Sequence, residues 1–351
     1  MMDVKIIGLG TANPPLRLPQ EEIYQFYINS LSLSDQAKSL LERIFISNRS
    51  IAYRHFGMDS LADVHKNSQD ELIARFERFG VMIATESAQK ALDNAGLSPN
   101  DVDALIVNTC TGYLCPGLTS YVAQSLSMKK NIWPFDLMGM GCGGAIPALK
   151  TAYNFLSANP DKNVLTISVE VCSATLFFSE APDVLVTNAI FGDGAAATVL
   201  TNRPGKQGIF LKQFSVGLFP EYRSHVRYIT QDSKLRNVLS PEVPSLGAKG
   251  GKQVIEELLN ECEKTYNDIA YWAIHPGGEK VIDALQHATG LPGEVLSPSR
   301  SVLRNYGNMS SATVLFVLDE IVRTGNPQAG DFGVLCSFGA GFSAFAALVE
   351  F

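Results

Sequence analysis

Cys142 is the side chain of this sequence best suited to covalent chemistry, because it lies in a glycine-rich run, Gly-Met-Gly-Cys-Gly-Gly-Ala, from residue 139. A strand-like segment (131–137) precedes the run, and small residues that predict a helix (145–156) follow it. Glycines permit a tight turn there. A thiol at the first turn of a helix lies at the positive end of the helix dipole, which favours the thiolate. The pattern predicts a nucleophile, with a small packing cysteine as the alternative interpretation.

A nucleophilic thiol needs a base or an ion-pair partner, and the sequence offers five histidines. Only His275 ends an apolar strand-like segment (271–274) and enters a turn, His-Pro-Gly-Gly, where α/β proteins place functional groups. Asn308 follows Gly307 and opens a helical run. Its amide can donate to a carbonyl oxygen that becomes negative, or it can cap the helix. We expect these residues to meet Cys142 at one cleft.

The order of segments in the first half of the chain recurs in the second half. Asn-Asp-Val at 100–102 recurs as Asn-Asp-Ile at 267–269, which is an offset of 167 residues. With the same offset, the residue equivalent to Cys142 is Met309. Two α/β halves of this kind should pack sheet beside sheet, with helices between and outside them. We predict an N-terminal half, residues 1–203, and a C-terminal half, residues 204–351.

Composition narrows the class of protein. The 351 residues are 46% hydrophobic and 18% charged, which suits two closely packed halves. No apolar run is long enough to span a membrane, and no signal peptide opens the chain. A net charge of −7 argues against nucleic acid as a partner. The six cysteines lack the spacing of a metal site or a disulfide frame, so we expect no metal and a reducing, cytoplasmic location.

Four motifs taken together resemble type III polyketide synthases, the chalcone synthase-like branch of the thiolase-fold condensing enzymes. They are Gly-Cys-Gly-Gly-Ala at Cys142, Phe-Gly-Asp-Gly at Phe191, His-Pro-Gly-Gly at His275 and Tyr-Gly-Asn-Met-Ser-Ser-Ala around Asn308. The resemblance runs from Gly8 to the C-terminus. It implies a thiolase-like α/β fold, in which two duplicated βαβαβαββ-type halves form a layered αβαβα sandwich. It also implies a homodimer without a metal or bound cofactor.

The resemblance further implies the chemistry. Cys142 would take a starter acyl group from a coenzyme A thioester and hold the growing chain, while His275 keeps the cysteine ionised. His275 and Asn308 would bind the thioester carbonyl of malonyl-CoA while it loses carbon dioxide, because the charge develops on that oxygen. Repeated condensation would end in cyclisation to a pyrone or a resorcinol-type ring.

Substrate-contacting positions follow from the same resemblance. Phe191 would be a gatekeeper between the coenzyme A tunnel and the cavity, and Cys115 would reach the cavity wall of a neighbouring subunit. Arg49 and Arg54 fall where family members bind coenzyme A phosphates, although solvated surface arginines are the alternative. The remaining expected cavity residues are Cys110, Thr111, Asn237, Ser310 and Gly341.

Several positions depart from the plant pattern and resemble bacterial members. Asn237 stands in place of a second gatekeeper phenylalanine, and Cys110-Thr111 in place of a Thr-Ser pair. Because a thiol is a weak hydrogen-bond donor, we expect an aliphatic starter rather than a phenolic one. A ketoacyl-ACP synthase III-like enzyme is the alternative function, since it shares the fold and a Cys-His-Asn set. An inactive acyl-CoA-binding protein is disfavoured because all three residues are present.

Overall fold

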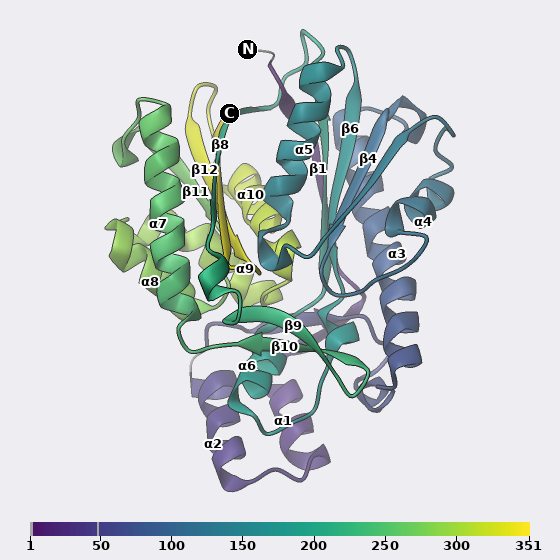
Figure 1. Cartoon of the computed structure of the whole chain (residues 1–351), viewed down its shortest axis with the longest axis vertical. Helices are drawn as coiled ribbons and strands as arrows, with labels where there is room; N and C mark the ends of the chain where they lie inside the picture. The colour runs from purple at the N-terminus through teal and green to yellow at the C-terminus, as the bar shows by residue number, and fades with distance from the viewer. Residues whose placement is uncertain (1–2, 48) are drawn as a thin grey trace.

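The two halves of the chain have similar orders of strands and helices, although the first supplies five strands to the central sheet and the second four (Figure 1). The computed structural model describes residues 3–47 and 49–351. The first half supplies the strands β1 (Lys5–Ala12), β4 (Ala104–Thr109), β5 (Trp133–Met138), β6 (Asn163–Glu170) and β7 (Gly194–Thr201). The second half supplies β8 (Ile209–Leu218), β11 (Ile269–Ile274), β12 (Phe332–Gly339) and β13 (Ser343–Glu350).

All nine strands form one mixed sheet in the order β11-β12-β13-β8-β1-β7-β6-β4-β5. In each half two parallel strands (β4 and β6, or β11 and β12) are followed by antiparallel ones. The two half-sheets meet along β1 and β8, where Lys5 and Ile6 pair with Phe210 and Ile209. Beyond this short contact the two half-sheets diverge, and the predicted boundary at residues 203 and 204 lies in the loop that joins them.

Helices form three layers around the two half-sheets. The helices α5 (Ala145–Ala158) and α10 (Thr313–Thr324) lie between the half-sheets, and each contacts strands of both halves. On the outer faces lie α3 (Gln69–Ala95) with α4 (Leu118–Ser125), and α7 (Val243–Glu261) with α8 (Glu279–Thr289) (Figure 1). The layered αβαβα arrangement predicted from the resemblance is therefore confirmed.

The helix α3 is longer than its sequence pattern predicts. Alanine and leucine spacing indicates a helix only from Ile83 to Ala95, but α3 begins at Gln69. Ser68 and Glu71 form a capping box at its start, where each side chain bonds the other residue's backbone N–H. Gly96 ends it in the left-handed conformation, with φ of +64°. The extra turns bury Phe76 and Phe79 against the first half-sheet.

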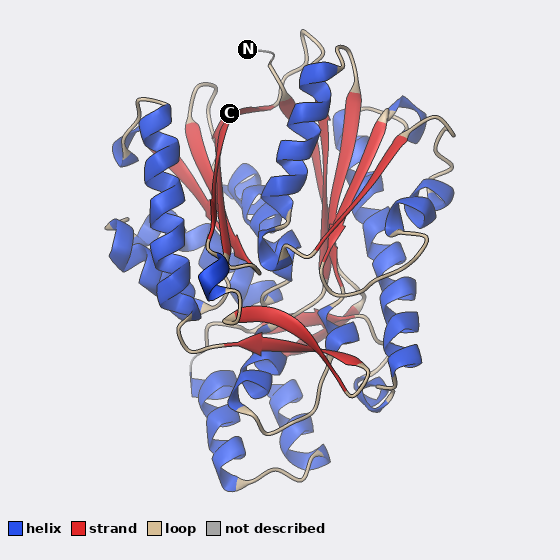
Figure 2. Cartoon of the chain, in the orientation of Figure 1, coloured by secondary structure: helices blue, strands red, loops and turns tan. Residues whose placement is uncertain are grey.

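A further group of elements lies below the sheets in Figure 2 and covers the strand ends that carry the motifs. The hairpin of β9 (Val226–Gln231) and β10 (Lys234–Leu239) crosses beneath the sheets. The other members are β2 (Leu16–Pro19), β3 (Tyr53–Phe56), α1 (Gln20–Ser30), α2 (Asp35–Glu42) and α6 (Pro182–Ile190). The helix α9 (Ser297–Tyr306) packs against α10, β11 and β3. No helix of the described residues is both long and apolar enough to cross a bilayer.

Candidate active site

Cys142 lies in a one-turn 3-10 helix, η4 (Gly141–Gly143), between the end of β5 and the start of α5. The chain reaches it through Gly139 and Gly141, whose φ angles of +87° and +56° favour glycine. A side chain at Gly143 would place its Cβ 2.7 Å from the ring of Phe345 in the other half. The glycine run therefore permits both the turn and its close contact with the second half-sheet.

His275 follows the last residue of β11. Its backbone N–H donates to the carbonyl of Cys336 at 2.8 Å, which continues the pairing of β11 with β12 past the end of the strand. The side chain is buried, and its Nδ1 has no hydrogen-bond partner among the residues that the structure describes. The carbonyl of His275 accepts from the N–H of Gly277, which turns the chain toward α8.

Asn308 is held by its backbone and by its side chain. Its N–H donates to the carbonyl of Ile190 and its carbonyl accepts from Gly192, both at 2.9 Å, so that it forms a β-bridge with Phe191. The side-chain Oδ1 accepts from the N–H of Ser310 at 2.8 Å, and Nδ2 donates to the carbonyl of Gly277 at 3.1 Å. The amide is thereby tied to the turn that follows His275.

Cys142, His275, Asn308 and Phe191 line one narrow cavity of about 60 Å³. Its remaining walls are largely apolar and come from the hairpin, α7, α8 and the end of β12: Val226, Leu239, Val243, Gly247, Gly277, Val281, Phe338, Gly339 and Phe342. Residues from both halves, far apart in the sequence, thus meet at the strand ends, as the motifs predict.

Burial dominates the electrostatics of the cavity. Desolvation raises the pKa of Cys142 to about 11, although the side chains of Ser310 and Asn308 act in the opposite direction. Desolvation lowers the pKa of His275 to about 3. At neutral pH both groups are therefore uncharged in the free protein. Desolvation therefore acts against the ionised cysteine that the helix start predicts.

A buried acid lies beside the cavity and was missed by the sequence analysis. Glu170, at the end of β6, accepts from the backbone N–H of Cys110 at 3.0 Å and from the hydroxyls of Thr111 and Ser311 at 2.8 and 2.5 Å. Burial raises its pKa. The only signal in the sequence is an acidic residue that follows the apolar run 164–169. Cys110 also contacts the Ser310 hydroxyl, at 3.2 Å.

The predicted coenzyme A contact at Arg54 is wrong. Arg54 lies on β3 with 0% of its side chain exposed, because alternate residues of that strand point inward. Its guanidinium donates to the Gln20 side chain and to the carbonyls of Asn188 and Phe191, at 2.7 to 2.8 Å. Arg54 therefore braces the segment that carries Phe191. Arg49 is exposed, as its predicted role requires.

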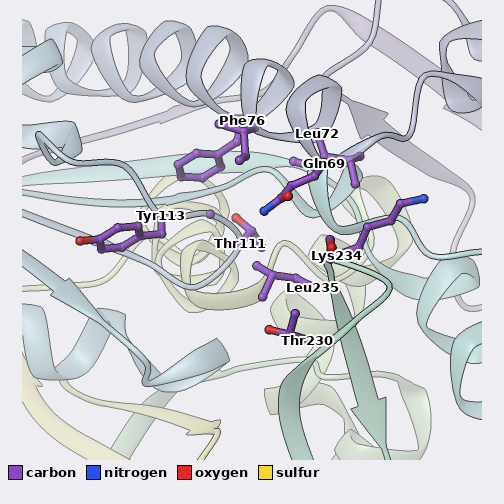
Figure 3. A pocket seen from close by; sticks show the side chains of 12 residues that line it. Gln69, Leu72, Phe76, Thr111, Tyr113, Thr230, Lys234 and Leu235 are labelled. Carbon is purple, nitrogen blue, oxygen red and sulfur yellow. The ribbon is translucent and has the colours of Figure 1, made fainter.

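A second cavity, of about 240 Å³, lies between the start of α3 and the hairpin (Figure 3). Thr111 lines it, together with Gln69, Leu72, Ile73, Phe76, Gly112, Tyr113, Ala174, Thr230, Ser233, Lys234 and Leu235. Asn237 is buried on β10, and Gly341, with φ of +133°, lies in the turn between β12 and β13. Cys115 is exposed in the loop between β4 and α4.

Two protein-family models match this chain, one for each half. The family model described as FAE1/Type III polyketide synthase-like protein matches residues 12–210, and that for the C-terminal domain of chalcone and stilbene synthases matches residues 212–350. The 1,3,6,8-tetrahydroxynaphthalene synthase of Streptomyces peucetius subsp. caesius is 30% identical to this chain, over 97% of the chain and 91% of its own length.

Two further comparisons extend the similarity. The alpha-pyrone synthesis polyketide synthase-like Pks18 of Mycobacterium tuberculosis is 27% identical, over 98% of this chain and 90% of its own. The crystal structure of PKS-I from the brown alga Ectocarpus siliculosus has a TM-score of 0.92 and 27% identity to this chain, and covers 99% of it and 98% of its own length. The similarity therefore spans both halves and the strand ends that form the cavity.

Proposed function

Because the chain belongs to the type III polyketide synthase family, we propose that Cys142, His275 and Asn308 carry out its chemistry. The protein is a malonyl-CoA-dependent acyltransferase that loads an acyl-CoA starter on a cysteine and extends it by repeated decarboxylative condensation. It then cyclises the chain to a pyrone or resorcinol-type ring. Matches of both halves to this family favour it over a ketoacyl-ACP synthase III-like enzyme. The observation that carries the residue assignment is the meeting of all three side chains on one cavity.

Loading begins from the neutral pair. The Sγ of Cys142 attacks the thioester carbonyl of the starter while its proton passes to His275, which acts as general base. The bond from that carbonyl to the sulfur of coenzyme A breaks, and the departing thiolate takes the proton from His275. The products are acylated Cys142 and free coenzyme A. Burial keeps the imidazole of His275 neutral, so its free ring nitrogen can accept the proton, but the lowered pKa of about 3 makes it a weak base until the substrate enters.

Extension needs stabilisation of negative charge on an oxygen. When malonyl-CoA loses carbon dioxide, the electron pair of the broken carbon–carbon bond moves onto the thioester oxygen. Asn308 carries two amide N–H donors and uses one of them for Gly277, so the other is available to that oxygen. His275 supplies a second donor from its ring N–H. The enolate carbon then attacks the acyl group on Cys142, which releases the thiolate.

Incubation of the purified protein with labelled malonyl-CoA and a panel of acyl-CoA starters tests this function. We expect mass spectrometry to detect cyclised polyketides built from two or more malonyl units. In a parallel incubation with malonyl-ACP, a single-condensation product bound to the carrier protein, together with no use of malonyl-CoA, would favour the ketoacyl-ACP synthase III-like alternative. The chemistry uses the coenzyme A thioesters alone and calls for no bound metal or cofactor.

A homodimer is part of the proposal. Large apolar side chains are exposed on the edge strand β5 (Trp133 and Met138), on β8 (Val216 and Leu218) and in the loop after β4 (Tyr113). Trp133 is 63% exposed and Leu218 65%. An exposed apolar edge strand pairs readily with another chain, and the exposed Cys115 lies in the same region as Tyr113. A fully active monomer in analytical ultracentrifugation at assay concentration would contradict this part.

An aliphatic starter and a cytoplasmic location complete the proposal. The second cavity supports an acyl chain with an apolar body, because Leu72, Phe76 and Leu235 line it. Each buried methylene of such a chain contributes about 0.8 kcal/mol. The six cysteines are all free thiols, which supports a reducing compartment. Faster turnover of 4-coumaroyl-CoA than of every aliphatic thioester would contradict the starter preference.

A further inference from the structure

The hairpin of β9 and β10 connects the two cavities by one continuous face. Three cross-strand pairs point inward in succession: Val226 with Leu239, Tyr228 with Asn237, and Thr230 with Leu235. The first pair lines the cavity of Cys142 and the third lines the second cavity. Because side chains alternate along a strand, the middle pair occupies the same face, about 7 Å from each neighbouring pair. Tyr228 and Asn237 therefore lie between the two cavities.

Both residues of this middle pair are polar, whereas Val226, Leu239 and Leu235 on the same face are apolar. Asn237 is only 7% exposed, and its Oδ1 has no hydrogen-bond partner among the described residues. The hydroxyl of Tyr228 lies 3.3 Å from that of Thr175, and burial holds the pKa of this phenol well above its usual value, so it stays protonated. A buried acceptor without a partner is unfavourable unless a ligand satisfies it. The site therefore calls for a ligand with a hydroxyl group at this point.

A growing polyketide on an alkyl starter has the matching order of groups. Its thioester lies at Cys142, its oxygenated carbons follow, and the alkyl tail of the starter lies farthest from the cysteine. The β-keto groups of such a chain enolise and then carry hydroxyl groups that donate. The cavities present the same order: the cysteine, a polar pair, and an apolar chamber lined by Leu72, Phe76 and Leu235.

We propose that Asn237 is a specificity-determining residue whose Oδ1 accepts a hydrogen bond from an enol hydroxyl of the growing chain. The proposal rests on the function proposed above. A saturated starter offers no donor and passes Asn237 without this contact, whereas a chain that has been extended gains it. The contact therefore retains extended chains in the enzyme and favours further condensation over early release as a short lactone.

The test replaces Asn237 by leucine, which keeps the approximate size and removes the acceptor. With hexanoyl-CoA and malonyl-CoA as substrates, we expect the ratio of longer to shortest products to fall by about three- to tenfold, as for the loss of one hydrogen bond. Val238→Ala, on the opposite face of β10, is the matched control and should leave the product ratio unchanged.

Thermal unfolding separates a role in binding from a role in folding. Because Oδ1 bonds to nothing in the described protein, Asn237→Leu should unfold at the same temperature as the wild type or at a higher one. An unchanged product ratio in a folded Asn237→Leu variant would overturn the proposal. Loss of folding or a lower unfolding temperature would also overturn it, because Asn237 would then be structural. Failure of the wild type to condense any starter would instead refute the proposed function.

Discussion

The turn before α5 and the turn before α10 occupy equivalent places in the two halves, yet they are built in opposite ways. The first, η4, is glycine-rich and presents the side chain of Cys142, the proposed nucleophile. The second, η9 (Ser310–Ala312), follows Asn308. The backbone and the side-chain amide of Asn308 each form hydrogen bonds through both a donor and an acceptor. Met309, the residue equivalent to Cys142 in the repeat, is fully buried in the core.

This difference separates two requirements of the reaction. The sulfur of a nucleophile has to approach a carbonyl carbon and later leave it. A glycine turn places that sulfur at the cavity with few hydrogen bonds to other side chains. An oxyanion donor has to be fixed before the charge develops, since its value depends on preorganisation. In the proposed mechanism, one of the two equivalent turns therefore carries the nucleophile and the other follows the donor.

The largest expected effect comes from the first turn. Cys142→Ala removes the proposed carrier of the acyl group, so polyketide formation should fall to background while the circular dichroism spectrum stays unchanged. The equivalent change in the second turn, Met309→Leu, conserves volume and should cost less than about 1.5 kcal/mol of stability with activity retained. Polyketide synthesis by Cys142→Ala, measured by mass spectrometry, would refute the assigned nucleophile.

A smaller effect is expected from the donor. Asn308→Ala should slow malonyl-CoA decarboxylation by ~10²–10³-fold, the usual result of removing one oxyanion donor. Acylation of Cys142 by the starter should change much less, because the sulfur and its base remain. Stopped assays of carbon dioxide release and of enzyme acylation measure the two steps separately. Equal losses in both steps would argue against a division of roles between the turns.

The pH dependence of alkylation tests whether the nucleophile is activated before substrate binds. Burial raises the pKa of Cys142 to about 11, so the reactive thiolate is scarce near pH 7 and grows as pH rises toward that value. Iodoacetamide labelling of Cys142 should therefore keep increasing past the ordinary thiol pKa of about 8.5. A plateau already reached below pH 7 would indicate that His275 and the helix start hold the thiolate against burial.

The smallest effect is expected at Gly139. A Cβ added at Gly139 would have no atom of the described residues within 4 Å. The φ of +87° is nevertheless unfavourable for any residue other than glycine. Gly139→Ala should lower the free energy of unfolding by about 1–2 kcal/mol with modest loss of activity. Chemical denaturation measures this, and Gly96→Ala, at φ of +64° and equally unobstructed, is the matched control outside the site. A much larger loss of activity at Gly139 would imply that the first turn is as tightly constrained as the second.

The sequence predicts the fold and the meeting of three motifs because those residues follow buried strands whose ends converge. The sequence does not predict the features that depend on which face of a short strand points inward. Arg54 looked like a phosphate ligand, but the inward face of β3 buries it beside Phe191. The β9–β10 hairpin has no strong periodic pattern, so the second cavity was not predicted. Glu170 was not predicted as a site residue because its hydrogen-bond partners, Thr111 and Ser311, are distant from it in the sequence.

Identification of the acylated residue tests the central claim most directly. The wild-type protein is incubated with hexanoyl-CoA in the absence of malonyl-CoA, digested at low pH, and its peptides are weighed by mass spectrometry. We predict one hexanoyl group on the peptide that contains Cys142, and none on the peptides with Cys110 or Cys172. Acylation at any other residue, or persistence of the label in Cys142→Ala, would contradict the account.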